Sequence, residues 1–343
     1  MSKLLSPLRR HVTLSLFLSA SLALLGARSV AAEPIKVGIL AFTSHSPSMI
    51  ARHKGFFDAA DLQVEFVKFQ AAQPMAVAIA SGDIDFGVTA ISGGLINLAA
   101  KGAVKVIGGA LQESDDVVGQ KILVSKAAYE KGMTTPAKLA GARYAVTTAG
   151  SSFHYMAHKI ADGAGFERSS LQITPLQKVP AVIAALKTGQ VDAWSIVPNI
   201  AAAIGKGGDV VEIGKVADYV KDYQVTTVFT SSKHAAEHGA LVRRFLKAFS
   251  QGVDVYNAAF VDKTLDQAAT DEVVGIVHQY VYSDQPLDKA APRIKAGAMR
   301  ISPNARLNLG SVADQLEWFK SEKLVPETVK IDDIVDPRYV ETY

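Results

Sequence analysis

The sequence predicts an α/β protein of two lobes, each a mostly parallel sheet flanked by helices, joined by two crossing strands. Short apolar runs that suit buried parallel strands alternate with helical patterns through most of the chain. This alternation starts twice, once near residue 36 and again near residue 143. About 310 residues follow a short N-terminal leader, which is enough chain for two lobes of ordinary domain size.

The first series supplies four expected strands and three expected helices. The strands are KVGIL, LQVEFVKF, IDFGVT and VKVIGGA, and the helices between them are SMIARHKGFF, PMAVAIAS and GLINLAAK. Strands that are apolar on both faces and joined through helices form a parallel sheet with helices covering both sides. We therefore expect a complete lobe from this series.

The second series repeats the plan. Its expected strands are RYAVTT, LQITPLQ, VDAWSIV and VVEIG, with helices SFHYMAHKIADGAG and PAVIAALKTG. Two further β-type segments, QKILVS and TTVFTS, bracket the series, and two strands that cross between lobes form a natural hinge. We expect residues 33–120 and 227–343 to form the first lobe, which holds both ends of the mature chain, and residues 121–226 to form the second.

One helix-to-strand joint occurs in both series. AIASGDIDF and AALKTGQVDAW each contain a Gly, two further residues and an Asp, which are Gly82 with Asp85 and Gly189 with Asp192. Gly suits the left-handed end of a helix. Asp at the entrance of a strand can accept hydrogen bonds from nearby backbone amides.

The first 32 residues have the order of a secretory signal peptide. Basic residues at Lys3, Arg9 and Arg10 precede an apolar run over residues 12–27, and small residues lead to an expected cleavage site after Ala32. Read as a membrane anchor, the apolar run falls short of the roughly 20 residues that cross a bilayer. We expect a protein exported to the periplasm.

The charge and the cysteine content argue against nucleic-acid binding and against sites that depend on cysteine. The formal net charge is +3, but loss of the four basic residues of the leader lowers Lys plus Arg from 36 to 32, against 33 Asp plus Glu. A nearly neutral mature chain is not expected to bind nucleic acid. The absence of cysteine excludes disulfides, thiolate metal sites and cysteine nucleophiles.

Polar loops follow the expected strands, and ligands of open α/β sheets bind beyond the carboxyl ends of strands. These loops are AFTSHSPS, TAISGG, LQES, TAGSSFH and SIVPN. Neutral hydrogen-bond donors and a few aromatic side chains are typical of a small-molecule cleft. The candidate ligand-binding residues are Ser44, His45, Thr89, Ser92, Gln112, Ser151, Ser152, Phe153, His154 and Trp194.

The segment TAGSSFHYM is the most specific of these loops. Its Gly-Ser-Ser turn opens a helix whose first amides could hold a carboxylate, a sulfonate or a phosphate. Alternatively, Ser151 or Ser152 is an ordinary helix cap. His45 and His154 are either ligand contacts or surface histidines. Trp194 is either a wall of the cleft or a core side chain.

The sequence predicts no catalytic, metal or cofactor site. HAAEH, from His234 to His238, matches the zinc-peptidase pattern H-x-x-E-H, but no third ligand lies at a recognisable spacing, so a solvated helical turn is favoured. A P-loop, a G-x-G-x-x-G after the first strand and a G-x-S-x-G elbow are all missing. We therefore expect a binding protein rather than an enzyme.

Five segments, in order, resemble the substrate-binding proteins of nitrate, sulfonate and taurine importers, a family that also contains binders of thiamine-pyrimidine precursors. They are KVGIL, ARHKGFFDAADLQVEFVKF, SGDIDFGVTA, GSSFHYMAHKIADGAGF and TGQVDAWSIVPN, within residues 35–247. The resemblance implies the type II periplasmic binding protein fold, with closure around a ligand. It points to Ser44, His45, residues 89–92, residues 151–153 and Trp194 as ligand contacts.

The resemblance implies a monomeric periplasmic protein that captures a small organic anion, a sulfonate or a carboxylate, and delivers it to an ABC permease with its ATPase. No Arg or Lys stands among the loop positions to bind a sulfonate by full charge. An aromatic or pyrimidine-type heterocycle is therefore an open alternative. A pyrimidine-forming enzyme on the same scaffold is a remote one, because such biosynthesis belongs in the cytoplasm.

Overall fold

The computed structural model describes residues 32–114 and 117–343. The expected signal peptide, apart from Ala32, lies outside the described residues. Within the described ranges, no helix is both long enough and apolar enough to cross a membrane.

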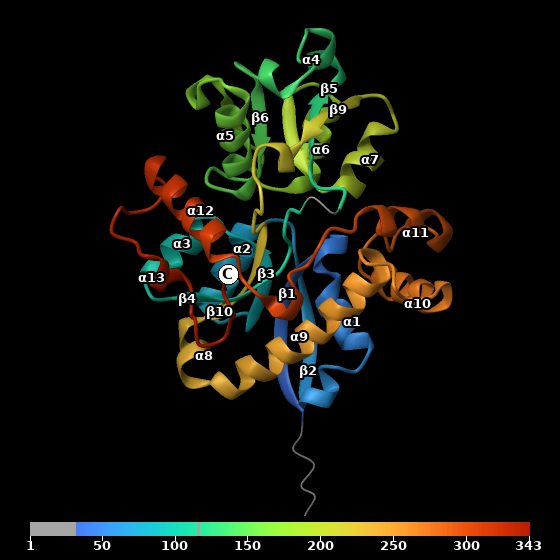
Figure 1. Cartoon of the computed structure of the whole chain (residues 1–343), viewed down its shortest axis with the longest axis vertical. Coiled ribbons are helices and arrows are strands. Elements are labelled where there is room, and N and C mark those ends of the chain that lie inside the picture. The colour runs from blue at the N-terminus through green and yellow to red at the C-terminus, as the bar shows by residue number, and fades with distance from the viewer. Residues whose placement is uncertain (1–31, 115–116) are drawn as a thin grey trace, which may run out of the picture. The chain divides into compact units, whose positions relative to one another are not determined.

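Two five-stranded sheets, each flanked by helices, form the framework, which confirms the predicted α/β fold class (Figure 1). The first sheet has the order β2-β1-β3-β10-β4. Its strands are β1 (Glu33–Leu40), β2 (Leu62–Phe69), β3 (Phe86–Ala90), β4 (Val104–Gly109) and β10 (Thr226–Ser231). Its helices are α1 (Ser46–His53), α2 (Ala72–Ser81), α3 (Gly93–Ala100), α8 (Ser232–Glu237), α9 (Gly239–Phe260) and α13 (Ile331–Ile334).

The second sheet has the order β7-β6-β8-β5-β9, and Figure 1 shows α5 and α7 on opposite sides of it. Its strands are β5 (Lys121–Ser125), β6 (Arg143–Val146), β7 (Gln172–Pro175), β8 (Ala193–Ile196) and β9 (Val210–Lys215). Its helices are α4 (Lys126–Glu130), α5 (Ser152–Ala164), α6 (Val179–Lys187) and α7 (Pro198–Gly205). The C-terminal part of the chain adds α10 (Gln267–His278), α11 (Leu287–Ala296) and α12 (Leu309–Ser321).

The chain passes from the first sheet to the second between β4 and β5 and returns between β9 and β10. The two crossing segments pair antiparallel, because Gln112 and Gln224 form a β-bridge and the amide of Glu113 donates to the carbonyl of Tyr223 (2.8 Å). The QKILVS and TTVFTS segments themselves become β5 and β10, the reversed strand of each sheet. Their apolar side chains are buried, which suits strands inside a sheet better than exposed connections.

The repeated Gly and Asp joint has the structure that the sequence predicts. Gly82 and Gly189 have positive φ values of 82° and 71° just after α2 and α6. Asp85 accepts a hydrogen bond from the amide of Lys36 (2.7 Å), and Asp192 accepts one from the amide of Arg143 (2.8 Å). Each Asp thus ties the entrance of one strand to its neighbour in the sheet.

The long helix α9 holds the start of α1 in place. A Cβ atom added at Gly252 of α9 would lie 2.1 Å from the carbonyl oxygen of Pro47, so only glycine allows the two helices to approach this closely. Farther along α9, Phe245 stacks on Phe86 of β3 with a centroid separation of 3.9 Å. These contacts anchor the segment between β1 and α1, which forms one side of the candidate site.

Candidate ligand-binding site

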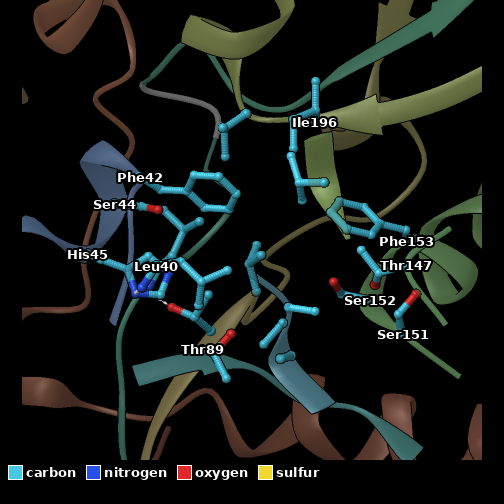
Figure 2. Close-up of a pocket in the computed structure, with 18 of the residues that line it drawn as sticks. Leu40, Phe42, Ser44, His45, Thr89, Thr147, Ser151, Ser152, Phe153 and Ile196 are labelled. Atoms are coloured by element: carbon cyan, nitrogen blue, oxygen red, sulfur yellow. Dashed lines mark hydrogen bonds between the residues drawn. The ribbon is translucent and has the colours of Figure 1, made fainter. Parts of the chain in front are cut away.

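A pocket lies between the strand-end loops of the two sheets (Figure 2). The first sheet contributes Leu40, Phe42, Ser44, His45 and Thr89, and the second contributes Thr147, Ser151, Ser152, Phe153 and Ile196. The crossing segments add Leu111, Gln120 and Val225.

On the first side, a short 3-10 turn over Thr43–His45 connects β1 to α1 and carries the polar side chains. The ring Nδ1 of His45 accepts a hydrogen bond from the amide of Leu40 at 3.4 Å, so the ring proton lies on Nε2. Burial lowers the pKa of His45 to about 3, which keeps the imidazole neutral. His45 can therefore offer a neutral donor to the pocket.

On the second side, the N-terminus of α5 faces the pocket. The first amides of a helix have no partner within the helix, and those of Ser152 and Phe153 have none elsewhere in the described residues. The hydroxyl of Ser152, a residue only 9% exposed, also lacks a described partner, and Figure 2 shows its oxygen turned toward the pocket. The buried hydroxyl of Ser151 is unpaired too. This end of the pocket therefore offers several hydrogen-bond donors, backbone amides and hydroxyls, that have no described partner.

Apolar side chains make up most of the remaining wall. Figure 2 shows Phe42 and Phe153 on opposite sides of the pocket, with Leu40 on the side of Phe42 and Ile196 above. None of the described residues that line the pocket is Lys, Arg, Asp or Glu. The arrangement can hold a small molecule between two aromatic rings while neutral donors bind an oxygen-rich group at one end.

The pocket brings together six of the ten predicted residues: Ser44, His45, Thr89, Ser151, Ser152 and Phe153. The other four do not line it. Ser92 caps α3 by accepting from the amide of Leu95 (3.2 Å), and Gln112 accepts from the hydroxyl of Tyr343 (2.8 Å). Trp194 is fully buried in the second lobe behind Phe153, with ring centroids 5.5 Å apart.

His154, the fourth, lies behind the N-terminus of α5. Its Nδ1 accepts from the amide of Gly150 (3.1 Å), and its Nε2 lies 3.1 Å from Nε2 of His158. Burial lowers the pKa of His154 to about 4, with a further contribution from His158. His154 thus orients the turn that carries Ser151 and Ser152 without lining the pocket.

Two polar residues of the lining, Gln120 and Thr147, were not predicted from the sequence. Gln120 lies immediately before β5 rather than after a strand, on the crossing segment that returns the chain to a sheet. Thr147 directly follows β6, and its position just after a buried strand is the signal that could have identified it.

Contacts beside the pocket join α5 to α12. Asp314 of α12 pairs with Lys159 (3.0 Å) and accepts from the hydroxyl of Tyr155. Glu322, just after α12, pairs with Arg168 (3.0 Å). Because α12 belongs to the C-terminal part of the chain, these interactions link it to the second sheet, through α5 and through the turn at Arg168 that follows α5.

The HAAEH motif lies away from the pocket, on α8 and the residue that follows it. His234 Nε2 is 3.7 Å from the carboxylate of Asp85. Among the residues that the structure describes, no group of three or more His, Cys, Asp or Glu side chains is placed to hold a metal ion.

One protein-family model matches more than half of the chain. The family model "NMT1/THI5 like" matches residues 42–259. No curated protein sequence matches the chain.

Solved structures share the fold at low sequence identity. The periplasmic aliphatic sulphonate binding protein SsuA of Escherichia coli has a TM-score of 0.66 at 21% identity, over 89% of this chain and 92% of that one. The periplasmic nitrate-binding protein NrtA of Synechocystis PCC 6803 has a TM-score of 0.70 at 13% identity, over 88% and 86%. A ligand-binding component of an ABC-type import system from Staphylococcus aureus has a TM-score of 0.66 at 16% identity, over 90% and 97%. The chain therefore has the fold of periplasmic binding proteins.

Proposed function

Because the chain belongs to the NMT1/THI5-like family, we propose that it is an exported solute-binding protein that delivers a small organic anion to an ABC importer. The similar structures named above are a sulphonate binder, a nitrate binder and a component of an ABC-type import system, which supports a transport role. The ligand is a carboxylate or a sulfonate, and the other partners are a permease and its ATPase.

One observation carries the proposal. The amides of Ser152 and Phe153 and the hydroxyl of Ser152 are free donors at the N-terminus of a 13-residue helix, and they face a pocket between two lobes. The positive end of the helix dipole and unpaired amides bind an anion without a paired cation. An acidic group placed there would satisfy all three donors.

The apolar walls support a particular shape for the rest of the ligand. Phe42 and Phe153 lie on opposite sides of the pocket, and a flat ring between them would bury its faces against aromatic surface (Figure 2). An aromatic acid fits both features. A neutral pyrimidine-type heterocycle is the second candidate, and the absence of charged side chains among the described lining residues favours it.

Binding by closure of two lobes fits the crossing segments. We place the first lobe at residues 33–120 and 227–343 and the second at residues 121–226. We expect the chain to bend where it crosses between the sheets, at the antiparallel segments around residues 111–113 and 223–225. A hinge there would open the pocket to solvent and close it over the ligand.

Binding rather than catalysis is supported by the lining. His45 is the one titratable side chain among the described lining residues, and its Nδ1 is already occupied by the amide of Leu40. General acid–base chemistry usually needs a second group that can orient or exchange a proton with the first.

A thermal-shift screen of the mature protein tests the proposal. The panel contains benzoate, benzenesulfonate, taurine, nitrate and an aminopyrimidine. A ligand at 100 times its dissociation constant stabilises the folded state by about 2.7 kcal/mol. We expect benzoate or benzenesulfonate to raise the melting temperature. Stabilisation by the aminopyrimidine alone would instead support the second candidate, and no stabilisation by any compound would contradict both.

A further inference from the structure

The pocket contains one polar side chain whose orientation is fixed by a buried acid. Gln120 is 2% exposed and lines the pocket, and Glu113 behind it is 0% exposed. The carboxylate of Glu113 accepts twice from Gln120, from its backbone amide through Oε1 (2.9 Å) and from its side-chain Nε2 through Oε2 (3.2 Å).

Glu113 is an unusual group to find buried. No described Lys or Arg forms an ion pair with it, and the neighbouring Lys121 is paired with Glu212 (2.7 Å). Burial raises the pKa of Glu113, while its bonds to Gln120 and the charge of Lys121 oppose that rise. Burying a carboxylate without a cation is costly, so the two hydrogen bonds from Gln120 are needed to offset the loss of solvation.

The geometry around Glu113 is tightly constrained. A Cβ atom at Gly119 would lie 1.7 Å from Oε1 of Glu113, so a side chain there would displace the carboxylate from its present position. The carbonyl of Gln120 accepts from the amide of Val216 (2.9 Å). The backbone of Gln120 is thus held on both sides, by Glu113 and by the returning segment.

These bonds decide which end of the Gln120 amide meets a ligand. Gln120 Nε2 donates to Oε2 of Glu113, and an ionised carboxylate, which can only accept hydrogen bonds, holds the amide in this orientation. The carbonyl oxygen Oε1 is the polar atom left over, and it accepts no hydrogen bond from any described residue. The pocket therefore offers an acceptor on the crossing segment and donors at the N-terminus of α5.

Resting on the proposed function, we infer that Gln120 is a specificity-determining residue, positioned by Glu113, that accepts a hydrogen bond from an N–H or O–H group of the ligand. The solute thus carries an acidic group at one end and an amino, amide or hydroxyl donor elsewhere. Simple acids without a donor bind more weakly, because Gln120 Oε1 then loses its contact with water and gains no partner.

Calorimetric titration with matched probes tests this inference. The parents are benzoate and benzenesulfonate, and the derivatives are the 2-, 3- and 4-amino isomers of each. In the wild-type protein we expect at least one amino isomer to bind about fivefold tighter than its parent. Testing three isomers covers the different distances at which the donor can stand from the acid.

Three variants assign the preference to Gln120. Gln120→Met keeps the length of the side chain but removes the acceptor, so the amino preference should vanish while the parent binds within about twofold of wild type. Glu113→Gln frees the Gln120 amide to turn over and should also reduce the preference. Gln190→Met, at an exposed glutamine of the second sheet that does not line the pocket, should leave it unchanged.

Each outcome has a distinct meaning. Equal weakening of parents and amino derivatives in Gln120→Met would show a structural role only and overturn the inference. Parents that bind with no amino isomer preferred in the wild-type protein would also overturn it, and the proposed function would stand. Failure of every probe to bind would remove the proposed function and this inference together. If Gln120→Met does not fold, the preference in Glu113→Gln decides.

Discussion

The amide of Gly93 donates a 2.9 Å hydrogen bond to the carbonyl oxygen of Gly150. Gly93 is the first residue of α3 on the first sheet, and Gly150 precedes α5 on the second. The bond therefore joins the two lobes directly beside the free donors of Ser152 and Phe153. The same peptide segment is held from the other side, because the amide of Gly150 donates to His154 Nδ1.

Replacement of Gly150 should affect stability and binding together. Its φ of +72° costs a side chain about 1–2 kcal/mol, so we expect Gly150→Ala to lower the free energy of unfolding by that amount. Relaxation of φ would also disturb the bond to Gly93 and weaken ligand binding about fivefold. The matched control is Gly141→Ala, because Gly141 also has a positive φ (+83°), but its sequence neighbours, unlike Ser151 next to Gly150, do not line the pocket. Chemical denaturation and calorimetry should show the stability loss in both variants and the affinity loss only at Gly150.

The hydroxyl of Ser152 should contribute directly to binding. Ser152→Ala leaves the fold intact and should weaken binding of an acidic ligand by about 1–3 kcal/mol, the usual cost of removing one partner of a buried hydrogen bond. Ser46→Ala is the control. Ser46 is likewise the first residue of an α-helix and has a buried, unpaired hydroxyl, but it does not line the pocket. Calorimetry should find wild-type affinity for Ser46→Ala. If Ser152→Ala also binds with wild-type affinity, the acidic group does not bind at the N-terminus of α5.

Trp194 should behave as a core residue. It is 0% exposed and lies behind Phe153, so Trp194→Ala should reduce the free energy of unfolding by about 3–5 kcal/mol. Compared with Trp194→Ala, Phe153→Ala at a half-buried lining residue should reduce the free energy of unfolding less and weaken ligand binding more. Thermal unfolding and titration of both variants separate the two roles. A Trp194→Ala protein of normal stability that no longer binds would restore the indole as a ligand contact.

Acid should destabilise the protein through its buried histidines. The pKa of His154 falls to about 4 in the folded state, against 6.5 for an ordinary histidine, and His158 and Glu322 are the titratable groups around it. The unfolded chain therefore takes up this proton first, so stability is complete above pH 6.5 and declines as the pH falls toward 4. For His154 the loss reaches about 3 kcal/mol.

The matching measurement is urea denaturation between pH 7.5 and 4. His154→Gln keeps an acceptor for the amide of Gly150 but cannot take up a proton, so its stability should fall less steeply than that of the wild-type protein. Parallel curves for the two proteins would show that the pKa of His154 is the same in the folded and unfolded states, and would contradict this prediction.

The order of buried strands and helices was predictable because apolar periodicity reports burial directly. The Gly and Asp joints were predictable for a similar reason, since the positive φ of Gly82 and the bond from the amide of Lys36 to Asp85 are local. The two segments predicted to cross between the lobes, QKILVS and TTVFTS, are instead the sheet strands β5 and β10. They are as apolar as any other strand, and the composition of a strand does not show its direction in the sheet.

The site was predictable only in part, and the reason is again physical. Loops that follow strands meet at one edge of a sheet, so Ser44, His45 and residues 151–153 could be found from position alone. Which side chain of a loop faces inward depends on packing. The hydroxyl of Ser92 caps helix α3, and the side chain of Trp194 is buried in the core beside its sheet. Gln120 is held at the pocket by its hydrogen bond to the buried Glu113, and no pattern in the sequence signals that contact.

We propose that the acidic group of the ligand binds at the N-terminus of α5. The most direct test is a crystal structure of the complex with the probe that stabilises the protein most. The claim predicts the ligand between Phe42 and Phe153, with its acidic oxygens about 2.7–3.2 Å from the amide nitrogens of Ser152 and Phe153. A ligand bound outside the pocket between the two sheets, or one inside it with its acidic group turned away from α5, would contradict the claim.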